Sequence, residues 1–159
     1  MLAPLLATLA VGGVHNADLN ALFATELPRV QAKTRIPVLM PDTMPTEIDP
    51  LYASSFATRK SYFLDLAGAP DCGQATACFE AEIWGEKGGK PSGLKPVQLA
   101  RGRHGRFKPL TCGASCSPPS VAWKERGVTY TIQANVGGKR TERRILVKMA
   151  NEAIRRGPR

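Results

Sequence analysis

Residue types that usually carry catalysis and bind cofactors are scarce in this sequence. Histidine occurs only twice, at His15 and His104, and aromatic residues make up 6% of the chain. No glycine-rich phosphate loop follows an expected strand and opens a helix. The apolar stretch over residues 1–14 is too short to span a bilayer as a helix. We therefore expect no cofactor and no transmembrane span, and the sequence disfavours histidine-based catalysis.

Cysteine is also sparse, but its positions are informative. Four cysteines allow three disulfide pairings. A local pairing is the simplest, whereas a crossed pairing would close longer loops and stabilise the fold more. The rival interpretation is a zinc site with four thiolate ligands, but the spacings differ from the two residues usual in zinc knuckles. Disulfides are favoured, and they indicate an oxidising compartment outside the cytoplasm. The residues concerned are Cys72, Cys78, Cys112 and Cys116.

Acidic residues are few in the second half of the chain. Residues 1–85 hold 5 Lys+Arg and 9 Asp+Glu, a net charge of −4, whereas residues 86–159 hold 17 and 4, a net charge of +13, and the two sum to +9. A basic half predicts an anionic partner such as nucleic acid, an acidic cell-wall polymer or a membrane surface. The plain alternative is a solvated face that keeps the protein in solution.

The first residues resemble part of a secretory signal. Residues 1–14 are apolar, but they lack the basic start of a signal peptide, and Ala17 is the candidate cleavage residue. The alternative is an N-terminal helix that packs on the body of the protein. We expect residues 1–17 to be a signal-peptide remnant and residues 18–159 to form a single domain.

The clearest local pattern lies between Cys112 and Val136. Residues 120–124 are expected to form a strand, residues 125–127 a turn, and residues 128–133 a second strand with alternating apolar and polar positions. Gly127 supplies the positive φ that a short hairpin loop needs. This hairpin is expected to form the inner part of a sheet.

The remaining segments predict more strands and two helical regions. We predict an α+β fold, in which a twisted antiparallel sheet of about six to seven strands carries the N-terminal and C-terminal helices on one face. The first helix would follow an Asn16 or Asp18 cap and continue through Leu27, and Pro28 would start a further helical turn. Further strands are expected at 61–66, 76–84 and 97–100, an edge strand or extended segment at 36–41, a loop at 42–50, an ambiguous segment at 51–55, and the last helix at about 141–156.

A glycine-punctuated basic turn is the candidate site for a partner. Guanidinium groups bind phosphate or carboxylate through paired hydrogen bonds, and Phe107 within this turn would stack on a base or a ring. An exposed hairpin tip without a function is the plain alternative. The predicted anion- or partner-binding residues are Arg101, Arg103, His104, Arg106 and Lys108.

Two weaker patterns bear on catalysis. His104 with Ser115 or Ser117 would form a nucleophilic pair, but no third residue orders it. Glu80 and Glu82 lie two residues apart on one expected strand face and would form paired carboxylates, although such a spacing usually marks the solvent side of a strand. We therefore predict that the chain is not an enzyme.

The C-terminal third resembles a group of bacterial proteins. Trp123, the turn ending in Gly127, residues 128–132 and a terminal amphipathic helix ending at residues 149–154 resemble uncharacterised secreted or membrane-tethered domains of cyanobacterial type. These domains also carry a similar Cys-Gly…Cys-Ser…Trp corner. The resemblance implies a curved antiparallel sheet with packed helices, an extracytoplasmic location, and a binding or sensing role without catalytic residues.

These patterns together predict an exported, non-enzymatic binding or sensing module of the cell envelope with a basic surface. Its expected partner is an anionic envelope polymer or a protein. Two alternatives stay open. One is a nucleic-acid-binding protein with a structural four-cysteine zinc site, and the other is a small hydrolase that uses His104.

The disulfide interpretation has a direct test by intact mass. If the four cysteines form two disulfides, reduction adds four hydrogens, or about 4 Da, before alkylation. Mass spectrometry before and after reduction and alkylation measures this gain. Four free thiols with a bound metal ion would instead contradict both the disulfides and the export prediction.

Overall fold

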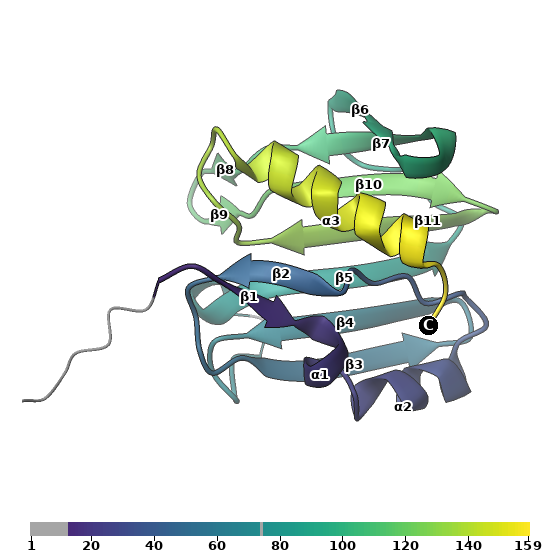
Figure 1. Cartoon of the computed structure of the whole chain (residues 1–159), viewed down its shortest axis with the longest axis horizontal. Helices are drawn as coiled ribbons and strands as arrows, with labels where there is room; N and C mark the ends of the chain where they lie inside the picture. Colours follow the sequence, from purple (N-terminus) through teal and green to yellow (C-terminus); the bar gives the residue numbers. More distant parts are fainter. Residues whose placement is uncertain (1–12, 74) are drawn as a thin grey trace, which may run out of the picture.

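One seven-stranded antiparallel sheet organises the chain in a computed structural model that describes residues 13–73 and 75–159 (Figure 1). The strand order is β3-β4-β5-β11-β10-β7-β6, so the two halves of the sequence meet where β5 pairs with β11. The strands are β3 (Tyr52–Thr58), β4 (Ser61–Ala67), β5 (Phe79–Lys87), β6 (Lys95–Leu99), β7 (Arg103–Lys108), β10 (Ser120–Glu125) and β11 (Val128–Ala134).

Helices and a small ribbon cover one face of this sheet, which we call the covered face (Figure 1). Helix α3 (Glu142–Arg156) lies across β6, β10 and β11, whereas α2 (Glu26–Lys33) contacts β3. This arrangement confirms the predicted α+β fold and the helices on one face. The other elements are β1 (His15–Asp18), α1 (Leu19–Leu22), β2 (Thr43–Thr46), η1 (Thr76–Cys78), η2 (Ala100–Gly102), β8 (Thr111–Cys112) and β9 (Cys116–Ser117).

The core lies between the covered face and these elements. In β4 the buried residues alternate, with Tyr62, Leu64 and Leu66 pointing into the core. Between α3 and the sheet, Trp123 of β10 and Leu146 of α3 are buried, with exposed fractions of 1% and 0%. Burial of large apolar side chains on one side of each strand is what fixes the register of the sheet.

The predicted hairpin over residues 120–133 is confirmed. Glu125 lies opposite Val128, so only Arg126 and Gly127 form the turn. Both residues have a positive φ, 50° and 79°, which is the conformation of the two-residue turn that matches strand twist.

The segment at residues 36–41, predicted as an edge strand or an extended segment, is not a strand. It is tied to the sheet by two tyrosines. The Tyr62 hydroxyl donates to Leu39 O at 2.8 Å and accepts from Leu39 N at 3.0 Å, and the Tyr130 hydroxyl donates to Pro37 O at 3.0 Å. The side-chain hydrogen bonds replace a strand ladder, because Pro37 has no amide hydrogen to give to one.

The prediction of a loop at 42–50 is wrong, because this segment contains β2. The segment at 51–55, which the sequence left ambiguous, belongs to β3 from Tyr52 onward. The expected N-terminal helix is divided into α1 and α2. Asp18 does cap α1, since its Oδ1 accepts from Asn20 N at 2.9 Å and from Ala21 N at 3.1 Å.

Most of the predicted signal-peptide remnant, residues 1–12, lies outside the described residues. Of the rest, His15–Asp18 forms β1, which pairs with β2 in antiparallel register. Ala17 is buried in that ribbon.

The packing of α3 predicts which substitutions in this helix lower the free energy of unfolding. Leu146→Ala removes a fully buried side chain and is expected to lower the free energy of unfolding by about 2–5 kcal/mol. Lys148→Ala, at an exposed position of the same helix, is the control and should change it by less than about 0.5 kcal/mol. Urea unfolding followed by circular dichroism measures both. Equal effects would show that α3 does not hold the core.

Candidate functional site

The face of the sheet away from the helices, which we call the open face, carries the candidate site. Since Tyr62, Leu64 and Leu66 point into the core, the alternation of β4 places Phe63 and Asp65 on the open face. The strand registers put Ser54 and Glu82 on either side of Asp65, and Gln133 beyond Glu82. A row of four polar side chains therefore crosses β3, β4, β5 and β11.

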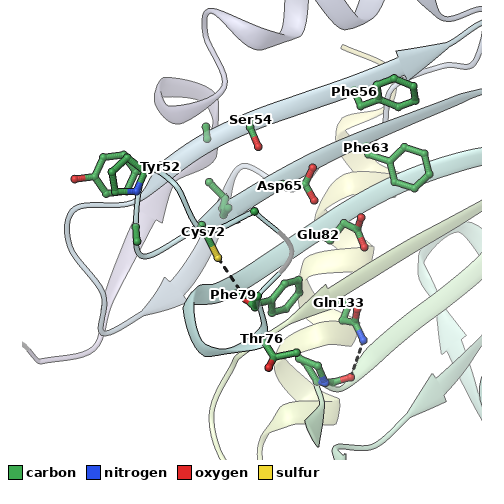
Figure 2. Close-up of a pocket in the computed structure, with 18 of the residues that line it drawn as sticks. Tyr52, Ser54, Phe56, Phe63, Asp65, Cys72, Thr76, Phe79, Glu82 and Gln133 are labelled. Atoms are coloured by element: carbon green, nitrogen blue, oxygen red, sulfur yellow. Dashed lines mark hydrogen bonds between the residues drawn. The ribbon is translucent and has the colours of Figure 1, made fainter. Parts of the chain in front are cut away.

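This row forms the floor of a cleft of about 730 Å³, which we call the open-face cleft (Figure 2). One wall is the loop before β5 that contains Cys72 and Thr76, and the other is the loop that contains Cys116 and Pro118. Gln133 Nε2 donates to Pro118 O at 3.0 Å and so ties the floor to the second wall.

A disulfide closes each wall of the open-face cleft. Cys72 is bonded to Cys78, and Cys112 to Cys116. Of the three pairings that the sequence allowed, the structure has the local one. A short covalent loop restricts the wall that carries it, so the cleft is largely shaped before any ligand binds.

Aromatic rings lie next to the polar row on the open face. Phe56, Phe63 and Trp84 come from three neighbouring strands, with 6.4 Å between the ring centroids of each adjacent pair. Phe63 and Trp84 are nearly parallel, at 16°, and Phe56 is 61% exposed. Phe56 and Phe63 also line the open-face cleft, which therefore combines an aromatic strip with a polar floor.

Asp65 and Glu82 form a carboxyl pair at the centre of the floor. They are direct cross-strand neighbours on the open face. Two half-buried carboxylates in adjacent positions repel each other, which favours the uptake of a proton by the pair. Burial, the charge of Asp65 and hydrogen bonding with Asp65 together raise the pKa of Glu82 to about 7. Burial also raises the pKa of Asp65, while hydrogen bonding with Glu82 opposes that rise. The two carboxyl groups therefore share a proton that they bind more tightly than a free carboxyl group does.

The carboxylate pair considered for Glu80 and Glu82 does not form, because a β-bulge turns Glu80 away. Leu66 pairs with Ala81 while Ala67 pairs with Phe79, so Glu80 is the extra residue of β5. A bulge of this kind reverses the side-chain alternation beyond it. Phe79 consequently lines the open-face cleft, whereas Glu80 lies on the other side of the sheet, where it lines a separate hollow with Thr46.

Sequence reasoning missed Asp65, although the sequence contains a signal for it. Asp65 interrupts an apolar strand between Leu64 and Leu66. A carboxyl group in such a strand is expected to have a partner when it is half-buried. The identity of that partner depends on strand order, which local patterns do not supply.

The predicted basic turn is largely a strand, and its residues separate. The turn itself is η2, and residues 103–108 form β7. Arg103 is bound by Glu125 through two hydrogen bonds, and Arg101 donates to Arg155 O at 3.0 Å. His104, Arg106 and Lys108 alternate along the open face of β7. The structure thus places three of the five predicted residues on one face and engages Arg103 elsewhere.

The pairing of His104 with Ser117, considered for the hydrolase alternative, does not form. His104 Nδ1 lies 3.1 Å from Gln98 Nε2. Ser117 lies near Lys108, whose Nζ donates to it at 3.5 Å. Lys108 is four residues further along β7 than His104, which corresponds to roughly 13 Å.

Metal binding by the cysteines is not supported by this structure, because all four sulfurs are in disulfides. Within residues 13–73 and 75–159, no group of three or more His, Cys, Asp or Glu side chains is arranged to hold a metal ion. Over the same residues, no helix combines the length and the apolar character needed to cross a bilayer.

Comparison with known proteins yields no relative for this chain: no family model, curated protein or solved structure matches it significantly. The resemblance to exported cyanobacterial-type domains therefore stays a prediction. Arguments about function rest on the geometry of the sites.

The raised pKa of Glu82 predicts how stability depends on pH. A carboxyl group with a folded pKa near 7 binds its proton more tightly when folded, so stability falls as pH rises from about 4.5 through 7. Glu82→Gln removes this loss and should gain roughly 1–2 kcal/mol over the wild type between pH 5.5 and 8.5, after allowing for solvent screening of a half-exposed group.

Urea unfolding at the two pH values measures the effect. Glu86→Gln, the same change at an exposed position of β5, is the matched control and should keep the wild-type pH dependence. If Glu82→Gln also kept it, the shared proton would be ruled out.

Proposed function

We propose that the protein is an exported, non-enzymatic binding module of the cell envelope that holds an amine-bearing ligand in the open-face cleft. The observation that carries this proposal is the Asp65–Glu82 pair at the floor, next to exposed aromatic rings. An ammonium group donates up to three hydrogen bonds and would bridge both carboxylates. Its carbon chain would lie along Phe63, where the ring also attracts a cation.

The charge of the open-face cleft supports a cationic ligand. The chain has a net charge of +9, yet the described residues that line the cleft include Asp65 and Glu82 and no Lys, Arg or His. A carboxylate that loses its proton in this place gains an unbalanced negative charge. A bound ammonium group would neutralise it at the point where burial makes it costly.

The described lining of the open-face cleft supports binding over covalent catalysis. No cysteine thiol or histidine accompanies the carboxyl pair among the described lining residues. The pair itself can hold a proton or an ammonium group.

The two disulfides support the exported location. Disulfides persist in oxidising compartments and are rare in the cytoplasm. Here they close both walls of the open-face cleft, so the same bonds that favour an oxidising compartment also shape the site.

A lysine-type probe tests the proposal. Acetyl-Lys-Lys-amide stays cationic between pH 5.5 and 8.5, because its amines have a pKa near 10.4. NMR titration should show binding to the wild type that is at least about 10-fold tighter than binding of the Nε-acetylated peptide. Affinity should rise with pH through about 7, since an ammonium group favours the fully ionised pair.

Variants of Asp65 and Glu82 test whether the carboxyl pair binds the ammonium groups of the peptide. Asp65→Asn and Glu82→Gln should each weaken binding about 10-fold or more, whereas Glu86→Gln, outside the cleft lining, should not. Equal affinity for the acetylated peptide, or no loss in the two cleft variants, would refute the proposed function.

A further inference from the structure

A second site lies at the end of the sheet where β3 turns into β4. A hollow of about 600 Å³ there has a small apolar floor formed by Ile36, Pro37 and Val128. Five of its eight lining residues are cationic and exposed, and we call this set the basic hollow. Its cationic residues are Arg35, Arg59, Lys60, Lys87 and Arg126.

Backbone hydrogen bonds fix the four segments that build the basic hollow. Lys87 N donates to Lys60 O at 2.8 Å, and Arg35 N donates to Arg59 O at 3.2 Å. Next to Arg126, Gly127 O accepts from Gly88 N at 2.8 Å. The backbone positions of the five cationic residues are therefore held close together at this end of the sheet.

The cations of the basic hollow form no ion pairs in the described part of the chain. No acidic side chain is among its described lining residues, and none of its five cations takes part in the ion pairs formed by residues 13–73 and 75–159. The acid nearest in sequence to Arg126 is Glu125, which Arg103 engages. Five like charges at one edge repel one another, and a bound anion would relieve that repulsion.

We propose that the basic hollow binds a flexible, phosphate-bearing polymer. Its three guanidinium groups match the forked geometry of phosphate oxygens, and its two ammonium groups supply compact point charges. Five cations exceed the charge of a single phosphate, so the arrangement fits a chain with several closely spaced phosphates. The site is independent of the open-face cleft, which lies toward the other end of β4, near Ala67.

This site differs from the basic segment predicted from the sequence. That segment gathers His104, Arg106 and Lys108 on β7, whereas the basic hollow draws on residues spread from Arg35 to Arg126. The two surfaces make a matched comparison, because a double charge reversal in either one changes the net charge by the same amount.

Binding of end-labelled polyphosphate, followed by fluorescence anisotropy at several salt concentrations, tests the proposal. The wild type should bind, and Arg59→Glu with Arg126→Glu should weaken binding at least about 10-fold and lower the salt slope by roughly 2. Arg106→Glu with Lys108→Glu is the control and should weaken binding less than about 3-fold. Arg59, Arg126 and Arg106 are exposed and Lys108 is half-exposed. Circular dichroism checks that the variants fold.

Specific outcomes would overturn the proposal. Absence of polyphosphate binding by the wild type would do so, as would equal losses in the two double variants, which would mean that only net charge matters. If only Arg106→Glu with Lys108→Glu weakened binding, the polymer would bind on the open face of β7 and not in the basic hollow. Equal binding of poly-glutamate with the same number of charges, or tighter binding of duplex DNA than of polyphosphate, would reject the assignment to a flexible phosphate polymer.

Discussion

The ladder between β5 and β11 holds the two halves of the sheet together, and both candidate sites depend on it. It runs from Lys87 opposite Val128 to Ala81 opposite Ala134. At one end it places Glu82 beside Gln133 in the open-face cleft, and at the other it places Lys87 beside the turn that carries Arg126. Without this pairing, Gln133 and Arg126 would be separated from the other residues of the two sites.

The bulge at Glu80 decides what the open-face cleft contains. It keeps Ala81 and Ile83 in the core while turning Phe79 toward the open face. One extra residue in β5 therefore exchanges a carboxylate for an aromatic ring at the edge of the cleft. The remaining carboxylate, Glu82, pairs with Asp65 instead, and this pairing across strands produces the shared proton.

The charge of each site depends on which strands and loops lie side by side, and not on the net charge of the stretch of chain that supplies them. The first 85 residues have a net charge of −4, but they contribute Arg35, Arg59 and Lys60 to the basic hollow. The same stretch contributes both carboxyl groups of the open-face cleft. The proposed module thus presents an acidic site and a basic site on one small domain, which suits it to ligands of opposite charge.

The sequence by itself determined the local elements whose signals are short in range. Period-two alternation and the Arg126-Gly127 turn specified the β10–β11 hairpin, the apolar stripe specified α3, and close cysteine spacing favoured disulfides. Only the tertiary structure decided the sites, because Asp65 meets Glu82, and Arg35 meets Arg59, through contacts between separate segments. Local patterns describe how a segment is buried, whereas strand order and bulges decide which buried or exposed groups become neighbours.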